Sequence, residues 1–231
     1  CNQIKNYLIN EDLENAVNFP LQDSSELKGI SSFLDLADNL GVIHRNISEG
    51  PIRSVEINCY GTLDQIKPIS LSFLRSLLQN RVPERVNFIN AETIAKELGI
   101  ELSINYSTSD SNYSNLISAR VVAKNDIIFE GSVFNADLPR LVNLMGYKME
   151  VNLKGTLLFI QNDDVPGVVG KVGTILGKNK INIGAYLLSQ HSKEKLAFAV
   201  IRLDSPIDEK LIGELQNVDE VKFVNQIQIN S

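Results

Sequence analysis

The last third of the chain switches repeatedly between two hydrophobic periods, and this switching limits the fold more than any other feature of the sequence. Runs of β-branched and large apolar residues predict strands, and apolar residues three or four positions apart predict helices. The expected elements are a strand at 156–160, a helix at 168–176, strands at 181–188 and 196–203, a helix at 207–215 and an alternating strand at 221–229. Strand, helix, strand, strand, helix, strand within about 75 residues is the order of the ferredoxin-like βαββαβ unit.

The residues before this unit predict a mixed α/β domain, so the fold class of the whole chain is α+β. The first expected elements are a helix end at 1–10, a capping box at Asp23–Glu26, a helix from 27 that stops at Gly41, a strand at 55–59 and a helix at 66–78. They are followed by a strand at 86–89, a helix between Asn90 and Gly99 with Ile94, Ala95 and Leu98 inward, an exposed loop at 103–115, and a hairpin of 116–122 with 127–133. Its topology does not follow from the sequence.

Composition excludes several classes of function. The net charge of -6 and the pI of about 5.1 argue against binding to nucleic acid or to an anionic membrane surface. No run approaches the roughly 18 apolar residues that a bilayer span requires, and no signal peptide opens the chain. Cys1 and Cys59 show no metal or disulfide spacing, so both are expected to be reduced thiols in the cytoplasm.

The densest polar cluster lies at the corner between the strand at 156–160 and the helix that follows. Pro166 suits the first helical turn, and Gly167 permits close approach of a ligand. The N–H groups of the helix favour a carboxylate, while Asp163 or Asp164 could pair with an ammonium group. Asn182, at the next strand, supplies both a donor and an acceptor. These groups suit a zwitterionic amino acid; alternatively, Asn162 and Asp164 only cap the helix.

The glycines, the histidines and a group of basic residues give weaker evidence for a functional site. The glycines at 167, 170, 173 and 177 do not have GxGxxG spacing, and close helix–sheet packing explains them better than a phosphate loop. His44 is expected at a helix end and His191 in a solvent-facing loop, and neither belongs to a nucleophile or metal pattern. Catalysis by this chain alone is therefore not expected. Four basic residues near the seam between the units are either scattered surface charge or an anion site: Arg140, Lys148, Lys154 and Arg202.

The segments DDVPGVVGKVGTILG (163–177), INIGA (181–185) and AVIRLD (199–204) together resemble an ACT domain. More narrowly, they are similar to the ACT domain that ends the long, three-part D-3-phosphoglycerate dehydrogenases. Residues 15–18 resemble the segment by which that family's chain leaves its catalytic part. Residues 86–91 and 130–133 look like pieces of the family's intervening domain, which binds substrate or other anions allosterically.

The resemblance implies a parent enzyme that oxidises 3-phosphoglycerate with NAD in serine synthesis, with its catalytic part upstream of Cys1. The fragment itself would hold no cofactor and no metal. L-serine would be the effector at paired ACT domains, held by Asn162, Asp164 and Asn182, with Val165, Pro166 and Gly167 completing the corner. Asn162 stands where relatives usually carry an aromatic residue or histidine. Arg140 and Arg202 match the family's anion contacts, and Asn152 stands where a further arginine is expected.

We therefore expect three parts: a tail of the missing catalytic part at 1–22, an intervening allosteric domain at 23–152 and an ACT domain at 153–231. Two ACT units should associate edge to edge, because an uncovered strand seeks a partner. Two alternatives remain open. One is the regulatory part of an iron–sulfur serine dehydratase, which joins similar domains; the other is a dimerisation module that senses nothing.

Overall fold

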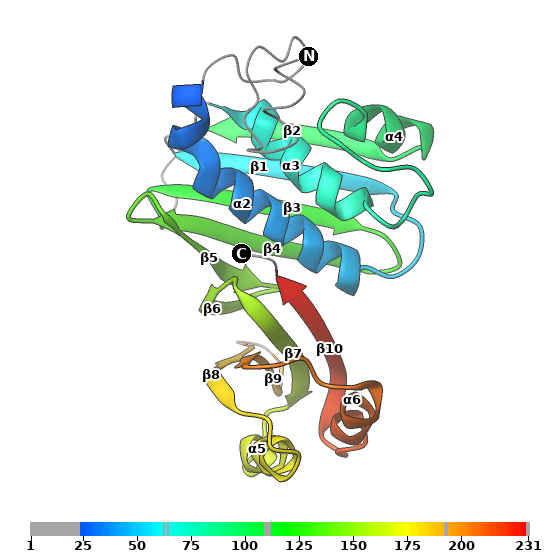
Figure 1. Ribbon diagram of the computed structural model, residues 1–231, viewed down its shortest axis with the longest axis vertical. Coiled ribbons are helices and arrows are strands. Elements are labelled where there is room, and N and C mark those ends of the chain that lie inside the picture. The colour runs from blue at the N-terminus through cyan, green and yellow to red at the C-terminus, as the bar shows by residue number, and fades with distance from the viewer. Residues whose placement is uncertain (1–23, 62, 64, 109–111, 192–193, 230–231) are drawn as a thin grey trace, which may run out of the picture.

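The computed structural model describes residues 24–61, 63, 65–108, 112–191 and 194–229, which form two sheet-based units (Figure 1). The expectations for residues 1–22 and for the Asp23 side chain lie outside the described residues. The first unit contains α2 (Ser24–Ile47), β1 (Ser54–Gly61), α3 (Ile66–Leu78), α4 (Ala91–Glu97), β2 (Glu101–Ser107), β3 (Asn115–Val122), β4 (Asp126–Phe134), β5 (Leu138–Leu144) and β6 (Tyr147–Asn152). The second contains β7 (Gly155–Asp163), α5 (Val168–Lys178), β8 (Ile183–Gln190), β9 (Leu196–Leu203), α6 (Glu209–Gln216) and β10 (Val221–Ile229).

The first unit is a mixed sheet with helices on one face, which agrees with the predicted mixed α/β domain, whose topology was not predicted. Its strand order is β2-β1-β3-β4-β5-β6, in which β1 and β2 are parallel and the other neighbours antiparallel. Helices α2 and α3 cover the same side of this sheet (Figure 1). The alternating burial of Val55, Ile57 and Cys59 on β1 confirms the predicted half-buried strand, and the predicted hairpin is β3–β4.

The prediction that the first helix stops at Gly41 is wrong, because α2 continues to Ile47. Gly41 is a contact point between helices rather than a terminator. A Cβ atom built on it would lie 2.5 Å from the Phe73 carbonyl oxygen and 3.0 Å from Ser76 Cβ on α3. The missing side chain therefore lets the two helices approach closely, which outweighs the modest cost of glycine inside a helix.

Carbonyl groups at and just after the carboxyl end of α2 accept hydrogen bonds from a side chain of another segment. Arg81, which follows α3, donates from Nη2 to the carbonyls of Ser48 (2.5 Å) and Arg45 (3.2 Å) and from Nη1 to that of Gly50 (3.1 Å). The last carbonyls of a helix have no partner within the helix, and a cation there also opposes the negative end of the helix dipole. Arg81 therefore fixes where α2 ends.

Residues 86–89 form a loop, so the strand predicted there is wrong. Val86 is buried as expected, but the Asn87 side chain accepts from the backbone N–H groups of Ile89 and Asn90 and turns the chain. Asn90 precedes α4 as predicted, yet its side chain accepts from the Asn87 N–H rather than capping the helix. Leu98, predicted to point inward, is half exposed.

Three strands of the first unit were not predicted. Residues 103–107, expected in a loop, belong to β2, an edge strand whose exposed polar residues resemble loop composition. Strand β5 begins with a Leu-Pro pair and contains a bulge, so its period is broken. Strand β6 alternates buried and exposed residues from Tyr147 to Val151. This regular pattern is typical of a strand, but no strand was predicted here.

The second unit has the predicted order of elements, and its sheet runs β10-β7-β9-β8. This is the strand order of the ferredoxin-like fold. Helices α5 and α6 cover one face, where their apolar residues pack on the alternate buried positions of β7 and β9. Asp208 caps α6 by accepting from the Leu211 N–H at 2.8 Å.

The face of the second sheet that no helix covers packs against the hydrophobic core of the first unit. One cluster of buried side chains includes residues of α2, α3 and the six-stranded sheet together with residues from β7, β9 and β10, namely Leu157, Phe159, Phe198, Val200, Ile227 and Ile229. Figure 1 shows β10 reaching up to α2 and β6 passing close to the second sheet. Hydrophobic packing thus runs without interruption from one unit into the other.

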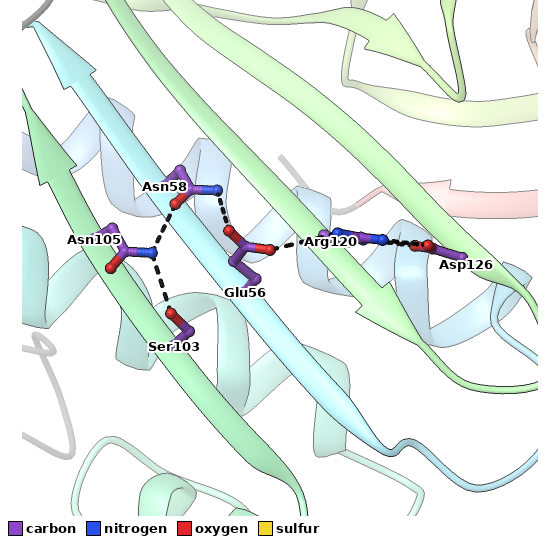
Figure 2. A network of polar contacts seen from close by, with 6 residues as sticks. All are labelled: Glu56, Asn58, Ser103, Asn105, Arg120 and Asp126. Atoms are coloured by element: carbon purple, nitrogen blue, oxygen red, sulfur yellow. Dashed lines mark hydrogen bonds and ion pairs between the residues drawn. The ribbon is translucent and has the colours of Figure 1, made fainter.

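The opposite face of the six-stranded sheet carries polar residues (Figure 2). Asn105 on β2 donates to Asn58 on β1 at 2.9 Å, and Asn58 donates to Glu56 at 3.0 Å. Arg120 Nη1 on β3 lies 3.8 Å from Glu56 Oε2. Arg120 also donates to Asp126, from Nε to Oδ1 at 2.8 Å and from Nη2 to Oδ2 at 2.5 Å. The polar groups at this end of the sheet therefore satisfy one another.

Candidate functional site

The corner between β7 and α5 leaves the start of the helix open. Gly167 is the residue before the helix, with φ of +100°, and no side chain caps the helix. Pro166 lies in the turn before Gly167 and not in the first helical turn as predicted. Because glycine tolerates this backbone conformation and brings no side chain, the first N–H groups of α5 face outward without a side-chain acceptor.

Neither of the predicted polar residues caps α5, so the alternative reading of Asn162 and Asp164 as helix caps is wrong. Asn162 is buried and its Nδ2 donates to the Asp163 carbonyl at 2.7 Å. Asp163 is paired with Lys222, Oδ2 to Nζ at 2.8 Å. Asp164 is exposed, and within the described part of the chain its carboxylate has no ion pair. Of the two acids, Asp164 is thus the one available to an ammonium group.

Asn182 lies far from this corner in the same chain. It is exposed, just before β8, and its Nδ2 donates to Asp204 Oδ2 at 2.5 Å. The strand register shows the separation: Asn162 lies opposite Ala197, which lies opposite Gln190 at the far end of β8 from Asn182. The structure therefore brings Asn162 and Asp164 together and places Asn182 at the other end of the sheet.

Exposed apolar side chains lie around the corner and on the edge strand. Val165 and Val169 are each 46% exposed, and Leu188 on β8 is 44% exposed. Val165 was predicted as part of the effector corner, and its side chain lies at the surface there. Among the described strands, β8 forms a backbone ladder with β9 only, so its other edge has no paired strand, although β6 contacts β8.

The four basic residues considered for an anion site lie at three different places in the structure. Arg140 on β5 and Arg202 on β9 line one cleft of about 340 Å³ between the two units. Lys148 lines a different cleft on the polar face of the first sheet. Lys154 lies in the link between β6 and β7, where its charge opposes the effect of burial and of Asp38, which raise the pKa of Asp35. Only the two arginines share a site.

Asn152 contributes a feature that the sequence did not reveal. It lies directly opposite Arg140 in the β5–β6 pair and lines the same cleft. Its Oδ1 is buried and has no hydrogen-bond partner in the structure. A buried acceptor without a donor is costly, so this atom suits a bound group that carries a donor.

Both histidines and the described cysteine lie outside these sites. His44 is in the last turn of α2, as predicted, but it is wholly buried and burial lowers its pKa to about 3. His191 is half-buried, and its ring lies 5.2 Å from that of Tyr147. The free thiol of Cys59 is buried, which raises its pKa to about 11 and makes it a poor nucleophile. Within the described ranges, no cluster of three metal-ligating side chains occurs.

None of the described helices is both long and apolar enough to cross a bilayer.

Comparison with known proteins identifies both the first unit and the chain as a whole. Residues 29–145 match the family model of the D-3-phosphoglycerate dehydrogenase intervening domain. The D-3-phosphoglycerate dehydrogenase of Bacillus subtilis is 30% identical over 93% of this chain and 41% of its own length. That of Methanocaldococcus jannaschii is 29% identical over 98% of this chain and 44% of its own length. The chain therefore spans less than half of these relatives.

A solved structure similar to part of the chain is the ACT domain from GTP pyrophosphokinase of Chlorobium tepidum. It covers 32% of this chain and 97% of its own, with a TM-score of 0.27 and 17% identity. The sequence relatives and the family model, in contrast, agree with each other over the first unit. The chain belongs to the D-3-phosphoglycerate dehydrogenase family, with that family's intervening domain followed by a ferredoxin-like βαββαβ domain.

Proposed function

We propose that this chain is the regulatory part of an NAD-dependent D-3-phosphoglycerate dehydrogenase of serine biosynthesis, acting in the cytoplasm. In this proposal residues 1–22 are the tail of the catalytic part, 23–152 form the allosteric intervening domain and 153–231 the ACT domain. The ACT domain binds L-serine, and bound serine inhibits the parent enzyme. NAD belongs to the parent, and the fragment itself binds no cofactor, no nucleic acid and no membrane.

The observation that carries the proposal is the position of Asn162 and Asn182 at opposite ends of one sheet whose edge strand is open. If two copies pair through antiparallel β8 strands, the Ile183 end of each lies beside the Gln190 end of the other. Gln190 is at the same end as Asn162 and Asp164. Pairing therefore brings Asn182 of one subunit to the corner of the other, twice per dimer.

The corner has complementary groups for both charges of an amino acid. The exposed Asp164 carboxylate suits the ammonium group, and the uncapped N–H groups of α5 suit the carboxylate. Asn182 of the second subunit suits the serine hydroxyl, because its amide both donates and accepts. Val165, Val169 and Leu188 would lose exposed apolar surface in such a dimer, which favours association.

Inhibition requires that the site favours one arrangement of the subunits. The shared core offers a route, because β7 and β9 carry the corner on one side and pack on α2 and the first sheet on the other. Coupling between sites is typically about 1–3 kcal/mol, which corresponds to roughly 5–150-fold changes in affinity.

Isothermal titration calorimetry with L-serine tests this proposal. We expect one serine per chain in the wild type and none in Asp164→Ala, because the ammonium group loses its partner. Asp137→Ala, in the exposed β4–β5 turn, removes the same charge elsewhere and should bind normally. Sedimentation should report a dimer. The absence of heat in the wild type, or equal binding by Asp164→Ala, would contradict serine sensing, and a monomer that binds serine would contradict the shared site.

The cleft between the units is proposed as an anion site. Arg140, Arg202 and the carboxylate of Glu150 line it, and neither arginine makes an ion pair with another described residue. Inorganic phosphate and 3-phosphoglycerate should bind the wild type and lose affinity in Arg140→Ala and Arg202→Ala, while Arg85→Ala on the exposed loop after α3 leaves binding unchanged. Equal affinity in all four proteins would rule this site out without affecting the serine site.

A further inference from the structure

A continuous row of polar side chains crosses the face of the six-stranded sheet that has no helices. Each member lies directly opposite the next on the neighbouring strand, and the row runs Asn105, Asn58, Ser118, Glu130, Asn143 and Lys148. A polar open face is the default for an antiparallel sheet, so the row by itself indicates only hydration. Its two ends, however, differ in how the charges are arranged.

At the β1–β4 end the charged groups are paired, because Arg120 contacts both Glu56 and Asp126 (Figure 2). At the β4–β6 end they are not. Glu130 and Lys148 are separated by β5, and neither makes an ion pair with another described residue. Two strand spacings put their Cα atoms roughly 9–10 Å apart. A carboxylate and an ammonium group thus line the same cleft, one on each side of Asn143.

A bulge in β5 shapes the space between these two charges. Asn143 lies opposite Glu130 and Leu141 opposite Gly131, so Val142 has no partner on β4. Bulges redirect side chains and are common beside binding sites. Here Asn143 donates to Glu130 Oε2 at 2.7 Å and accepts from the Gly146 N–H at 2.9 Å. The Glu130 carboxylate is therefore held in place, and no hydrogen bond to its other oxygen occurs among the described residues.

The remaining lining of this cleft consists of Asn112, Tyr113, Leu116 and Val142. The ring of Tyr113 stands edge-on to that of Phe134, with centroids 5.9 Å apart, and Leu116 and Val142 are both buried beside it. Burial, followed by the charges of Glu150 and Glu130, raises the pKa of Tyr113. The cleft has a volume of about 350 Å³, in the range of small-molecule sites.

We propose that this cleft binds a free α-amino acid with a branched aliphatic side chain. Its ammonium group binds Glu130, its carboxylate binds Lys148, and its side chain packs against Tyr113, Leu116 and Val142. The order of charges across β5 matches the zwitterion, since a simple anion would meet Glu130 and a simple cation would meet Lys148. This site is separate from the proposed serine corner and does not depend on it.

Calorimetry with three matched probes tests the proposal on the whole chain. L-valine carries both charges, isobutylamine lacks its carboxylate, and 3-methylbutanoate lacks its ammonium group. Loss of one charge-assisted hydrogen bond should weaken binding about tenfold or more. We expect valine to bind once per chain and both analogues to bind at least about tenfold more weakly. Equal binding by 3-methylbutanoate would mean an anion site and would overturn the assignment.

Substitutions then locate the binding site. Lys148→Met and Glu130→Gln should each weaken valine binding about tenfold or more, and the glutamine retains an acceptor for Asn143. Lys124→Met removes an equivalent charge from the exposed β3–β4 turn and should have no effect. Asp164→Ala should also bind valine normally. No heat with valine, unchanged binding in both cleft variants, or loss of binding in Asp164→Ala would each overturn the proposal, and the last would place valine in the serine corner.

Discussion

Gly41 and His44 lie about one turn apart on α2 and fix this helix against two different neighbours. Gly41 brings the backbone of α3 close, as the short approach to the Phe73 carbonyl shows. His44 donates from Nε2 to the Ala119 carbonyl on β3 at 3.1 Å, and its ring centroid lies 4.3 Å from that of Phe129. Both positions are determined by close packing, and each therefore predicts a measurable effect of substitution.

Gly41→Ala should destabilise the protein by about 1–3 kcal/mol, because the added methyl group forces α2 and α3 apart. Urea unfolding followed by circular dichroism measures this change. Gly213→Ala in α6 is the control, since no atom lies within 4 Å of a Cβ there. The control should gain about 0.5–1 kcal/mol from helix propensity. Equal stability changes in the two variants would contradict the packing role of Gly41.

His44 makes stability depend on pH in a defined direction. Burial lowers its pKa from 6.5 to about 3, so between these values the unfolded chain binds a proton that the folded chain does not. Stability attributable to His44 is therefore constant above pH 6.5 and falls as pH drops toward 3, by up to about 1.4 kcal/mol per pH unit.

The measurement is the difference in unfolding free energy between the wild type and His44→Leu. Between pH 7.5 and pH 5 this difference should shift by about 2 kcal/mol in favour of the variant, because leucine takes up no proton. A difference that is constant over this range would show that His44 titrates normally in the folded state.

At the scale of elements, the sequence predicts regular segments and misses those whose pattern is broken by contacts from elsewhere. The second unit was predicted in full order, because each strand and helix there has a clear period. Helix α2 was cut short at Gly41, since the closeness of α3 is not visible in the local sequence. The polar edge strand β2 and the bulged β5 lack the alternation of ordinary strands.

The candidate site was predictable to the same extent. Asn162 lies near the end of β7 and Asp164 directly follows that strand, so their proximity follows from the chain itself. The location of Asn182 at the far end of the sheet depends on strand register, which the sequence does not specify. Arg140 and Arg202 were grouped with Lys148 and Lys154 by position along the chain; the family resemblance selected the two arginines, and packing of the two units puts this pair in one cleft.

The end of α2 gives a prediction at this scale. Arg81→Met should destabilise the protein by about 1.5–3 kcal/mol, because the carbonyls of Arg45, Ser48 and Gly50 lose a charged donor. Hydrogen exchange should increase in the last turn of α2 first. Arg85→Met, on the exposed loop nearby, is the matched control and should change neither quantity. Protection that decreases uniformly along α2 would argue against a capping role.

At the scale of the molecule, one hydrophobic core includes buried residues of both units, and this predicts that they unfold together. Phe198 on β9 is wholly buried; its ring lies 5.4 Å from that of Tyr147 on β6 and 6.3 Å from that of Phe223 on β10. A change at this position therefore affects packing on both sides of the link at residues 153–154.

Calorimetric unfolding should accordingly show one transition, and Phe198→Ala should lower its midpoint through a loss of about 3–5 kcal/mol. Hydrogen exchange should rise in β4 and α2 as well as in the second sheet, because they share buried contacts with it. Two separate transitions, of which only one responds to Phe198→Ala, would mean that the units unfold independently.

If serine binds at the proposed shared site, the opposite positions of Asp164 and Asn182 have a consequence for mixtures of two variants. Alone, an Asp164→Ala chain and an Asn182→Ala chain should each form dimers in which every serine site is damaged. Mixed together, they should form hybrids with one site damaged twice and one site intact, because the intact site takes its acid from one parent and its amide from the other. Two variants that each fail to bind serine alone should thus regain serine binding when they are mixed, at up to half of the sites in each hybrid.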